Sequence, residues 1–191
     1  SLGVPVFEIP TMLPAVTGLR LRECLERQLD RMGGRVRYQQ KVLAVPQMTC
    51  DGVTAAVGEG GKAVLRVKAR AVVLASGRFF GKGLQADRHV IREAVFGLPV
   101  YQPADRTHWH RKTLFDRAGH PIHRAGLAID TQMRPCSEGG RYIHPNLFAA
   151  GSILAHQDWM RQKCGSGLAI ASAYAAVHAA QTVLRRSPST A

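Results

Sequence analysis

Apolar residues recur with the period of a helix near the start of the chain. The stripe begins after Thr17-Gly18 and stops at Gly33-Gly34, and its members are Leu19, Leu21, Cys24, Leu25, Leu29 and Met32. A largely 3.6-residue spacing predicts an amphipathic α-helix, and paired glycines are typical of a helix C-terminus. The first regular element is therefore expected to be this helix.

Apolar runs separated by glycine turns predict strands in the next part of the chain. Strands are expected over 35–45, 53–58, 63–68 and 70–75, with turns at Asp51-Gly52 and Gly60-Gly61. The short middle strands form a β-meander in this interpretation, whereas the run at 70–75 is apolar and is expected to be buried. A helix, a strand, a meander and a buried strand in this order indicate an α/β fold with an inserted antiparallel sheet.

Periodicity weakens after residue 84. Residues 85–126 are polar and rich in histidine, and we expect them to form an excursion over the sheet edge, with a helix near 105–114. Short strands are expected at 127–130 and within 141–150, followed by a helix of small residues at 167–184. We therefore predict one sheet-containing domain made of two segments, 3–84 and 127–184, with the excursion at 85–126 inserted between them. Residues 185–191 are expected to be a disordered tail.

Composition narrows the classes of function. The apolar fraction of 46% in 191 residues is enough for a folded core, and no run approaches 18 apolar residues, so no membrane-spanning segment is expected. The net charge of +13 suits an acidic partner, a phosphorylated substrate or an anionic membrane face. Because the basic residues are scattered and aromatic residues make up only 6%, nucleic-acid binding is disfavoured.

Cysteine and histidine spacing gives no metal site. The four cysteines contain no C-x-x-C pair, which excludes the usual zinc and iron–sulfur spacings. The histidines of the later part of the chain show no helical i, i+4 ligand spacing; they are His108, His110, His120, His123, His144 and His156. One of them could serve as a base in a hydride step, and Asp158 and Glu93 are further acid–base candidates.

Two buried strands with similar endings point to a ligand at a sheet edge. Residues 71–77 and 146–152 each run from an apolar strand into a small residue and a glycine, and Gly165 and Gly167 open the last helix. Glycines allow a ligand to approach the backbone closely, and a helix start offers free N–H groups to an anionic ligand. The strand ends therefore predict one ligand across the carboxyl edge of the sheet. The usual G-x-G-x-x-G turn between a strand and a helix is missing, so either this is not a dinucleotide-binding protein or the part that holds the pyrophosphate lies upstream of residue 1.

The same segments resemble a known family. The residues that carry the resemblance are 8–14, 73–77 with Phe79-Phe80, Gly83-Leu84, 91–93, and 147–152 with 164–167. Together they resemble the anaerobic glycerol-3-phosphate dehydrogenase B subunit, a flavoprotein with a glutathione-reductase-like FAD fold, from about residue 7 to 181. The resemblance implies a partial Rossmann-like FAD/NAD(P)-binding fold: a parallel sheet plus an antiparallel meander, with helices packed on the sheet and the N-terminal glycine-fingerprint unit missing.

The resemblance also assigns roles to individual residues. It implies that Val42 meets the adenine, that one glycine turn passes beside the cofactor, that a second lies at the ribityl chain, and that the last helix begins facing the flavin ring. The residues of the two turns and the helix start are Ala75, Ser76, Gly77, Gly151, Ser152, Gly165, Ser166 and Gly167. The chain departs from the family at Ala155-His156, which replace two glycines, and at Ser166, which replaces another.

The resemblance finally implies an activity. The expected reaction is oxidation of glycerol 3-phosphate to dihydroxyacetone phosphate, with FAD or FMN as cofactor in the full-length protein. Arg92, Arg78 and Lys82 are candidates to hold the substrate phosphate, because guanidinium groups pair bidentately with phosphate oxygens; the alternative is that they form a solvated basic surface. Electrons would pass to a quinone through a membrane-anchored iron–sulfur subunit, and a catalytic flavoprotein subunit would be a second partner. The protein would be cytoplasmic, peripheral to the inner face of the cell membrane, and the fragment alone would be inactive and bind flavin weakly or not at all. The alternative left open is a basic binding module without redox activity.

Overall fold

The computed structural model describes residue 3 and residues 15–186. The chain divides into two compact units, Ser1–Gln40 and Lys41–Ala191, which are described separately. The division expected from the sequence, at residues 84 and 126, stays a prediction. The motif at 8–14 and the end of the expected tail, 187–191, lie outside the described residues.

The first unit contains the helix that the apolar stripe predicted. Helix α1 spans Val16–Arg31, and the chain leaves it through Gly33, which has a φ of +76°. The N–H of Gly34 donates to the carbonyl of Leu29 at 2.8 Å, a hydrogen bond that closes helix C-termini of this type. The strand expected over 35–45 is wrong in its first part, because β1 begins only at Lys41. Gln39 has a φ of +57°, which an extended strand does not permit.

The second unit begins with the expected meander. Strands β1 (Lys41–Thr49), β2 (Gly52–Glu59) and β3 (Lys62–Ala69) form an antiparallel sheet in the order β1-β2-β3. The turns fall at Asp51-Gly52 and Gly60-Gly61 as predicted. This confirms the inserted antiparallel sheet.

A parallel pair of strands lies at the centre of this unit. Strand β4 (Val72–Leu74) pairs in parallel with β7 (Leu147–Ala149), with Val72 opposite Leu147. Both are shorter than the sequence predicted. A parallel pair together with antiparallel sheets makes this a mixed α/β fold.

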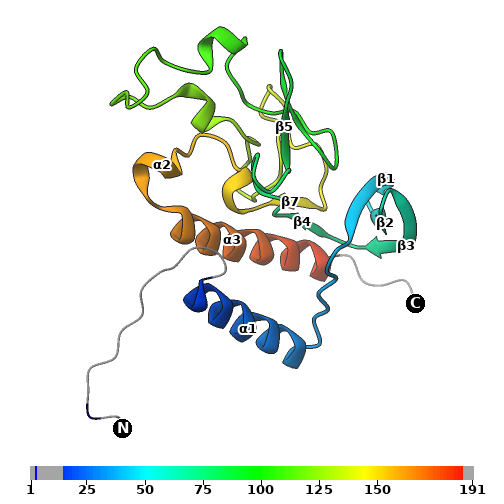
Figure 1. The fold of residues 1–191 in the computed structure, drawn as a ribbon. Coiled ribbons are helices and arrows are strands. Elements are labelled where there is room, and N and C mark those ends of the chain that lie inside the picture. Colours follow the sequence, from blue (N-terminus) through cyan, green and yellow to red (C-terminus); the bar gives the residue numbers. More distant parts are fainter. Residues whose placement is uncertain (1–2, 4–14, 187–191) are drawn as a thin grey trace. The chain divides into compact units, whose positions relative to one another are not determined.

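The two faces of this pair are covered by different parts of the chain (Figure 1). Helix α3 (Gly165–Arg186) packs on one face, where Ala176 and Ala180 meet Phe148 and Ala150. The larger apolar cluster forms on the other face, under the excursion; its fully buried members include Leu84, Ile91, Leu127, Leu147 and Ile153. The chain thus places the ends of β4 and β7 between a helix and the excursion.

Helix α3 also has the length and composition of a membrane-spanning helix. Over Gly165–Arg185 it is apolar enough to cross a membrane by these criteria alone, which the sequence analysis did not expect. Ala176 is fully buried and Ala180 nearly so in the core of the unit, so one face of the helix belongs to the folded domain. Most of its remaining surface is exposed.

The excursion differs most from the expectation. It contains a hairpin that the sequence pattern did not reveal, β5 (Leu84–Ala86) with β6 (Ile91–Glu93). The helix expected at 105–114 is wrong: only a 3-10 turn forms there, η1 (Arg106–His108). The carboxylates of Asp105 and Asp116 accept hydrogen bonds from nearby backbone N–H groups, at 2.8 Å in each case, and such local bonds compete with a helix.

Short elements complete the unit. They are η2 (Pro121–Arg124), η3 (Gly151–Ile153) and α2 (Trp159–Gln162). The strand expected at 127–130 is wrong, because single bridges from Leu127 to Leu154 and from Ile129 to Pro135 take its place.

Candidate functional site

The two glycine turns lie together at one edge of the parallel pair. Gly77 follows β4 and Gly151 follows β7, and both have left-handed backbones, with φ of +72° and +78°. A Cβ placed on Gly77 would lie 3.6 Å from the hydroxyl oxygen of Ser152. Because the strands run parallel, both turns emerge at their carboxyl ends, where ligands of open α/β sheets bind.

The start of α3 is fastened to the second turn. The N–H of Gly151 donates to the hydroxyl oxygen of Ser172 at 2.8 Å, and that hydroxyl donates to the carbonyl of Leu168 at 2.6 Å. Ser172 is buried, so this link is shielded from water. It places the turn at Gly151 beside the first turns of the helix. The sequence signal for Ser172 was a polar residue within an apolar helix.

The backbone at these positions is open to a ligand. A Cβ built on Gly151, Gly165 or Gly167 meets nothing within 4 Å, and Ser152, Gly165, Ser166 and Gly167 are exposed. The helix start therefore leaves room for an anionic or carbonyl-bearing group to reach its N–H groups. These residues fit a bound cofactor, while their individual roles stay predictions.

The side chain of Arg78, the residue after Gly77, connects the first glycine turn to the second through hydrogen bonds. Its Nε donates to the carbonyl of Ser152 at 2.7 Å, and its Nη2 donates to the carbonyls of Leu154 and Gln157, both at 3.1 Å. Its Nη1 donates to the carbonyl of His123. The side chain is buried; burial lowers the pKa of the guanidinium and the charge of Asp158 opposes this shift. Arg78 holds the chain together, which leaves little of it for a substrate phosphate.

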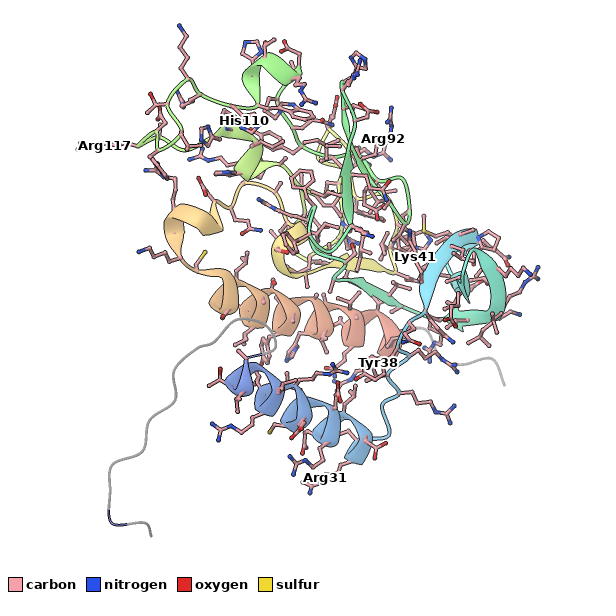
Figure 2. The ribbon with its side chains drawn as sticks, viewed as in Figure 1. Arg31, Tyr38, Lys41, Arg92, His110 and Arg117 are labelled. Atoms are coloured by element: carbon pink, nitrogen blue, oxygen red, sulfur yellow. The ribbon has the colours of Figure 1, made fainter. Side chains whose placement is uncertain are left out.

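The other two phosphate candidates are on the surface. Arg92 lies on β6 (Figure 2) and pairs with Asp87. Hydrogen bonds from the backbone of His89 and Val90 and from Arg92 lower the pKa of Asp87 to about 2. Lys82 is exposed in the loop that follows Gly77, with a φ of +60°. Arg92 thus already has an anionic partner.

Val42 is not among the residues at the sheet edge. It is half-buried in β1, where it pairs with Val57 of β2. The structure brings the two glycine turns together and links the second of them to α3 at Ser172, whereas Val42 lies in the antiparallel β1-β2-β3 sheet.

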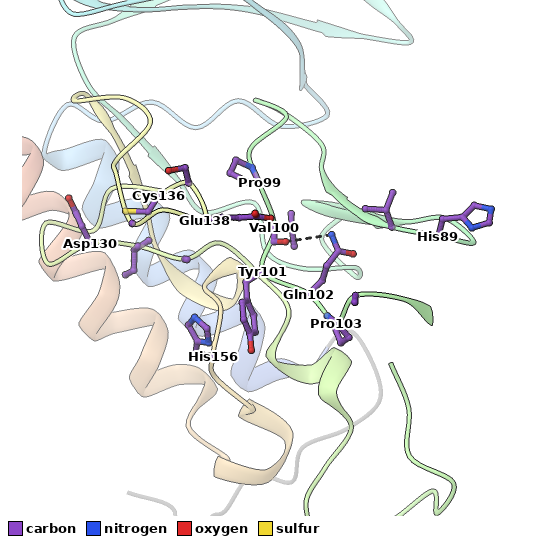
Figure 3. Close-up of a pocket in the computed structure, with 16 residues that line it drawn as sticks. His89, Pro99, Val100, Tyr101, Gln102, Pro103, Asp130, Cys136, Glu138 and His156 are labelled. Atoms are coloured by element: carbon purple, nitrogen blue, oxygen red, sulfur yellow. Dashed lines mark hydrogen bonds between the residues drawn. The ribbon is translucent and has the colours of Figure 1, made fainter. Parts of the chain in front are cut away.

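A pocket of about 630 Å³ opens beside the loop that follows Ser152 (Figure 3). The rings of Tyr101 and His156 lie in contact at its wall, with centroids 4.2 Å apart. Gln102 fixes the adjoining hairpin, since its side chain accepts from the N–H of Ile91 at 2.6 Å and donates to the carbonyl of Ile91 at 2.9 Å. Glu138 adds a carboxylate to the pocket.

Three histidines of the excursion, His110, His120 and His123, lie close together. The rings of His110 and His123 both lie edge-on to His120, at centroid distances of 5.4 and 5.3 Å. His123 Nδ1 is 3.6 Å from a carboxylate oxygen of Asp158; burial lowers the pKa of His123 and the charge of Asp158 opposes it. Within the described residues, no group of three or more His, Cys, Asp or Glu side chains is arranged to hold a metal ion.

Comparison with known families agrees with the open glycine site. Residues 2–168 match the family described as FAD binding domain. The chain belongs to this family. The match supports FAD as the cofactor, and it covers both glycine turns and the first residues of α3.

Individual relatives agree with the resemblance seen in the sequence. The chain is 34% identical over 170 residues to the anaerobic glycerol-3-phosphate dehydrogenase B subunit of Vibrio cholerae, and 31% identical over 178 residues to the protein of that name from Vibrio vulnificus. It is 34% identical over 179 residues to the probable anaerobic glycerol-3-phosphate dehydrogenase B subunit of Halobacterium salinarum. These matches cover 89%, 93% and 94% of this chain but only 38%, 40% and 41% of the relatives. The chain therefore spans about two fifths of the length of these relatives. No solved structure matches it significantly.

Proposed function

We propose that this chain forms part of the flavin-binding domain of a glycerol-3-phosphate dehydrogenase B subunit. The observation that carries the proposal is the meeting of Gly77 and Ser152 at one sheet edge, linked through Gly151 to a helix whose first residues are open, in an FAD binding domain. The chain would supply a partial Rossmann-like fold, with its parallel pair at the centre. The unit that contacts the pyrophosphate would come from sequence outside this chain.

The residues at this edge suit redox chemistry on a flavin. FAD, when bound, accepts two electrons and so oxidises a secondary alcohol to a ketone. The N–H groups of Gly165–Gly167 and the positive end of the α3 dipole would stabilise negative charge on the reduced ring. The turns at Gly77 and Gly151 would let the backbone approach the cofactor where a side chain would intervene.

The names of the relatives support a glycerol-3-phosphate dehydrogenase with more than one subunit, and the finer assignments rest on the family resemblance. We propose glycerol 3-phosphate as the substrate, dihydroxyacetone phosphate as the product, and a second flavoprotein subunit as a partner. Electrons would continue to a quinone through a membrane-anchored iron–sulfur subunit, on the inner face of the cell membrane. Membership of the FAD binding domain family makes a basic binding module without redox activity the weaker alternative.

The test is flavin content in the full-length protein that contains this chain. Gly167→Val places a branched side chain at the open helix start, where a Cβ meets nothing within 4 Å, so the fold has room for it. We expect normal soluble yield with far less bound flavin, measured by the absorbance of the purified protein. Loss of soluble yield with flavin content unchanged would make Gly167 a packing residue and remove the support for this site.

A matched control is a glycine at which the fold leaves no space for a side chain. A Cβ on Gly126 would lie 2.4 Å from the carbonyl oxygen of Ile153. Gly126→Ala should therefore reduce soluble yield, with flavin lost only in proportion to folded protein. The two variants separate loss of the cofactor from loss of the fold.

A further inference from the structure

A second pocket shares the Tyr101–Pro103 segment with the pocket in Figure 3. Its volume is about 380 Å³, and Arg111, His120 and Arg124 are in its lining. We propose that this basic pocket binds the phosphate group of a small phosphorylated alcohol. The proposal rests on the proposed function and names the part of this chain that would recognise the substrate.

The two arginines have donors to offer. Arg124 is exposed, and its side chain makes no hydrogen bond or ion pair with any other residue in the described part of the chain. Arg111 uses its Nε, which donates to the carbonyl of Gly119 at 3.1 Å and lies 3.8 Å from a carboxylate oxygen of Asp116. Among residues 15–186 its terminal amino groups have no partner, so they remain for an anion. Two guanidinium groups around one pocket suit the oxygens of a phosphate.

The pocket wall is held in place before any ligand arrives. The N–H of Arg111 donates to His120 Nδ1 at 3.0 Å, and His120 Nε2 faces the carbonyl of Leu114 at 2.9 Å. Since a carbonyl only accepts, the His120 ring donates through Nε2 to Leu114 and accepts through Nδ1 from Arg111 in this arrangement. The N–H of Ile122 donates to the carbonyl of buried Trp109 at 3.1 Å, which closes the loop between the two arginines. A fixed backbone around the pocket reduces the part of the ordering cost of binding that comes from the loop.

The same wall is attached to the loop that follows the cofactor turn. The carbonyl of Arg124 accepts from the N–H of His156 at 2.9 Å, and Arg78 holds the carbonyls of both His123 and Ser152. A substrate whose phosphate binds at Arg124 is therefore anchored to the segment that carries Gly151 and Ser152. This is the arrangement expected of a residue that positions a substrate against a cofactor.

The charged groups around this pocket differ from those around the larger pocket and around the phosphate candidates predicted from the sequence. The larger pocket has Asp130 and Glu138 in its lining, and carboxylates repel a phosphate. Arg92 is paired with Asp87, and Arg78 is buried among backbone carbonyls. Arg111 also lies near a carboxylate, that of Asp116, but only through its Nε, and the side chain of Arg124 has no partner among residues 15–186, so Arg124 is the main phosphate ligand of this site.

The experiment measures binding to the full-length protein without turnover. Glycerol 3-phosphate, inorganic phosphate and glycerol are titrated and followed by calorimetry, with ³¹P spectra for the two phosphates. Wild-type protein should bind glycerol 3-phosphate and not glycerol. Arg124→Ala should weaken that binding by about tenfold or more, the effect of losing one charge-assisted pair, and Arg124→Lys should recover part of it. Equal affinity for inorganic phosphate and glycerol 3-phosphate would overturn the assignment to a substrate.

Arg117→Ala is the matched control. Arg117 is an exposed arginine of the same segment but is not part of the pocket lining, and Figure 2 shows it at the opposite edge of the segment from Arg92. It should leave the affinity unchanged, and equal weakening by Arg117→Ala and Arg124→Ala would reduce the site to general charge. Flavin absorbance is recorded on every sample. If flavin is bound but Arg124→Ala binds glycerol 3-phosphate normally, the pocket assignment fails and the proposed function stands; if wild-type protein binds no flavin, the proposed function itself fails.

Discussion

The side chain of Arg78 donates to the backbone carbonyl of Ser152 at 2.7 Å, so the residue after one glycine turn holds the residue after the other. The same guanidinium reaches the carbonyls of His123, Leu154 and Gln157. These segments lie 45 to 79 positions away from it in the sequence. The buried guanidinium of Arg78 therefore connects the sheet edge that carries the two glycine turns to the excursion.

Replacing Arg78 should destabilise the protein strongly. Arg78→Met removes a donor from four carbonyls; those of Ser152 and Leu154 keep the side-chain amide of Gln157, whereas those of His123 and Gln157 lose the donor they have. Each buried group left unsatisfied costs about 1–3 kcal/mol, so we expect the free energy of unfolding in urea to fall by at least about 2 kcal/mol. Arg92→Met removes only an exposed pair with Asp87 and should cost less than about 1 kcal/mol. Similar losses for the two variants would contradict the structural role of Arg78.

Ser172 should fix the turn at Gly151. In Ser172→Ala the N–H of Gly151 loses its acceptor, so its hydrogen exchange with D₂O should accelerate, and stability should fall by about 1–2 kcal/mol. Thr182 is the control on the same helix, because its hydroxyl donates to the carbonyl of His178 at 3.0 Å but is exposed. Thr182→Ala should change stability by less than about 0.5 kcal/mol and leave the Gly151 exchange rate as it was.

The sequence predicted elements well where one period dominates. The stripe of α1, the glycine turns of the meander and the small-residue helix α3 each have a local signal, and all three are present. The matching ends of β4 and β7 also allowed the meeting of their glycine turns to be foreseen, because parallel strands place their carboxyl ends at one edge.

The excursion could not be predicted in the same way. Its hairpin β5–β6 has strands of three residues each, too short for alternation to show. Its fixed points are contacts between distant residues, such as Arg78 with His123 and Gln102 with Ile91. Spacing along the chain holds no information about such partners, which is why Arg78 seemed a substrate ligand and the pocket at Arg111 and Arg124 was not foreseen.

His156 should carry a local backbone strain. Its φ is +65°, a conformation that costs a residue with a Cβ about 1 kcal/mol relative to glycine. The resemblance places glycines at both 155 and 156, but of the two only His156 has a positive φ. Both His156→Gly and His156→Ala lose the ring contact with Tyr101, and only glycine relieves the strain. His156→Gly should therefore be more stable than His156→Ala by about 1 kcal/mol in thermal unfolding.

Ala155 provides the opposite case. Because its φ is not in the left-handed region, Ala155→Gly should lower stability, by roughly 0.5–1 kcal/mol. If glycine were the better residue at 155 and no better than alanine at 156, the backbone conformations assigned to this loop would be wrong.

Buried His144 should make stability depend on pH. Its Nδ1 accepts from the N–H of Asn146 at 3.2 Å, and burial lowers its pKa from the ordinary value of 6.5. The unfolded chain therefore takes up a proton at a higher pH than the folded one. The free energy of unfolding should be greatest above about pH 6.5 and decrease as the pH falls toward the folded pKa, by at most about 1.4 kcal/mol per pH unit for one proton.

The variant that tests this is His144→Asn. Asparagine offers an acceptor near the place of Nδ1 and does not titrate, so the decrease in stability between pH 7 and pH 5 should become smaller. Part of the decrease should remain, because burial also lowers the pKa of His123, and a second substitution, His123→Asn, should reduce it further. His178→Asn, on an exposed part of α3, controls for the removal of a histidine as such. Urea unfolding at several pH values measures all four proteins, and an unchanged pH slope in His144→Asn would show that the buried imidazole does not control acid stability.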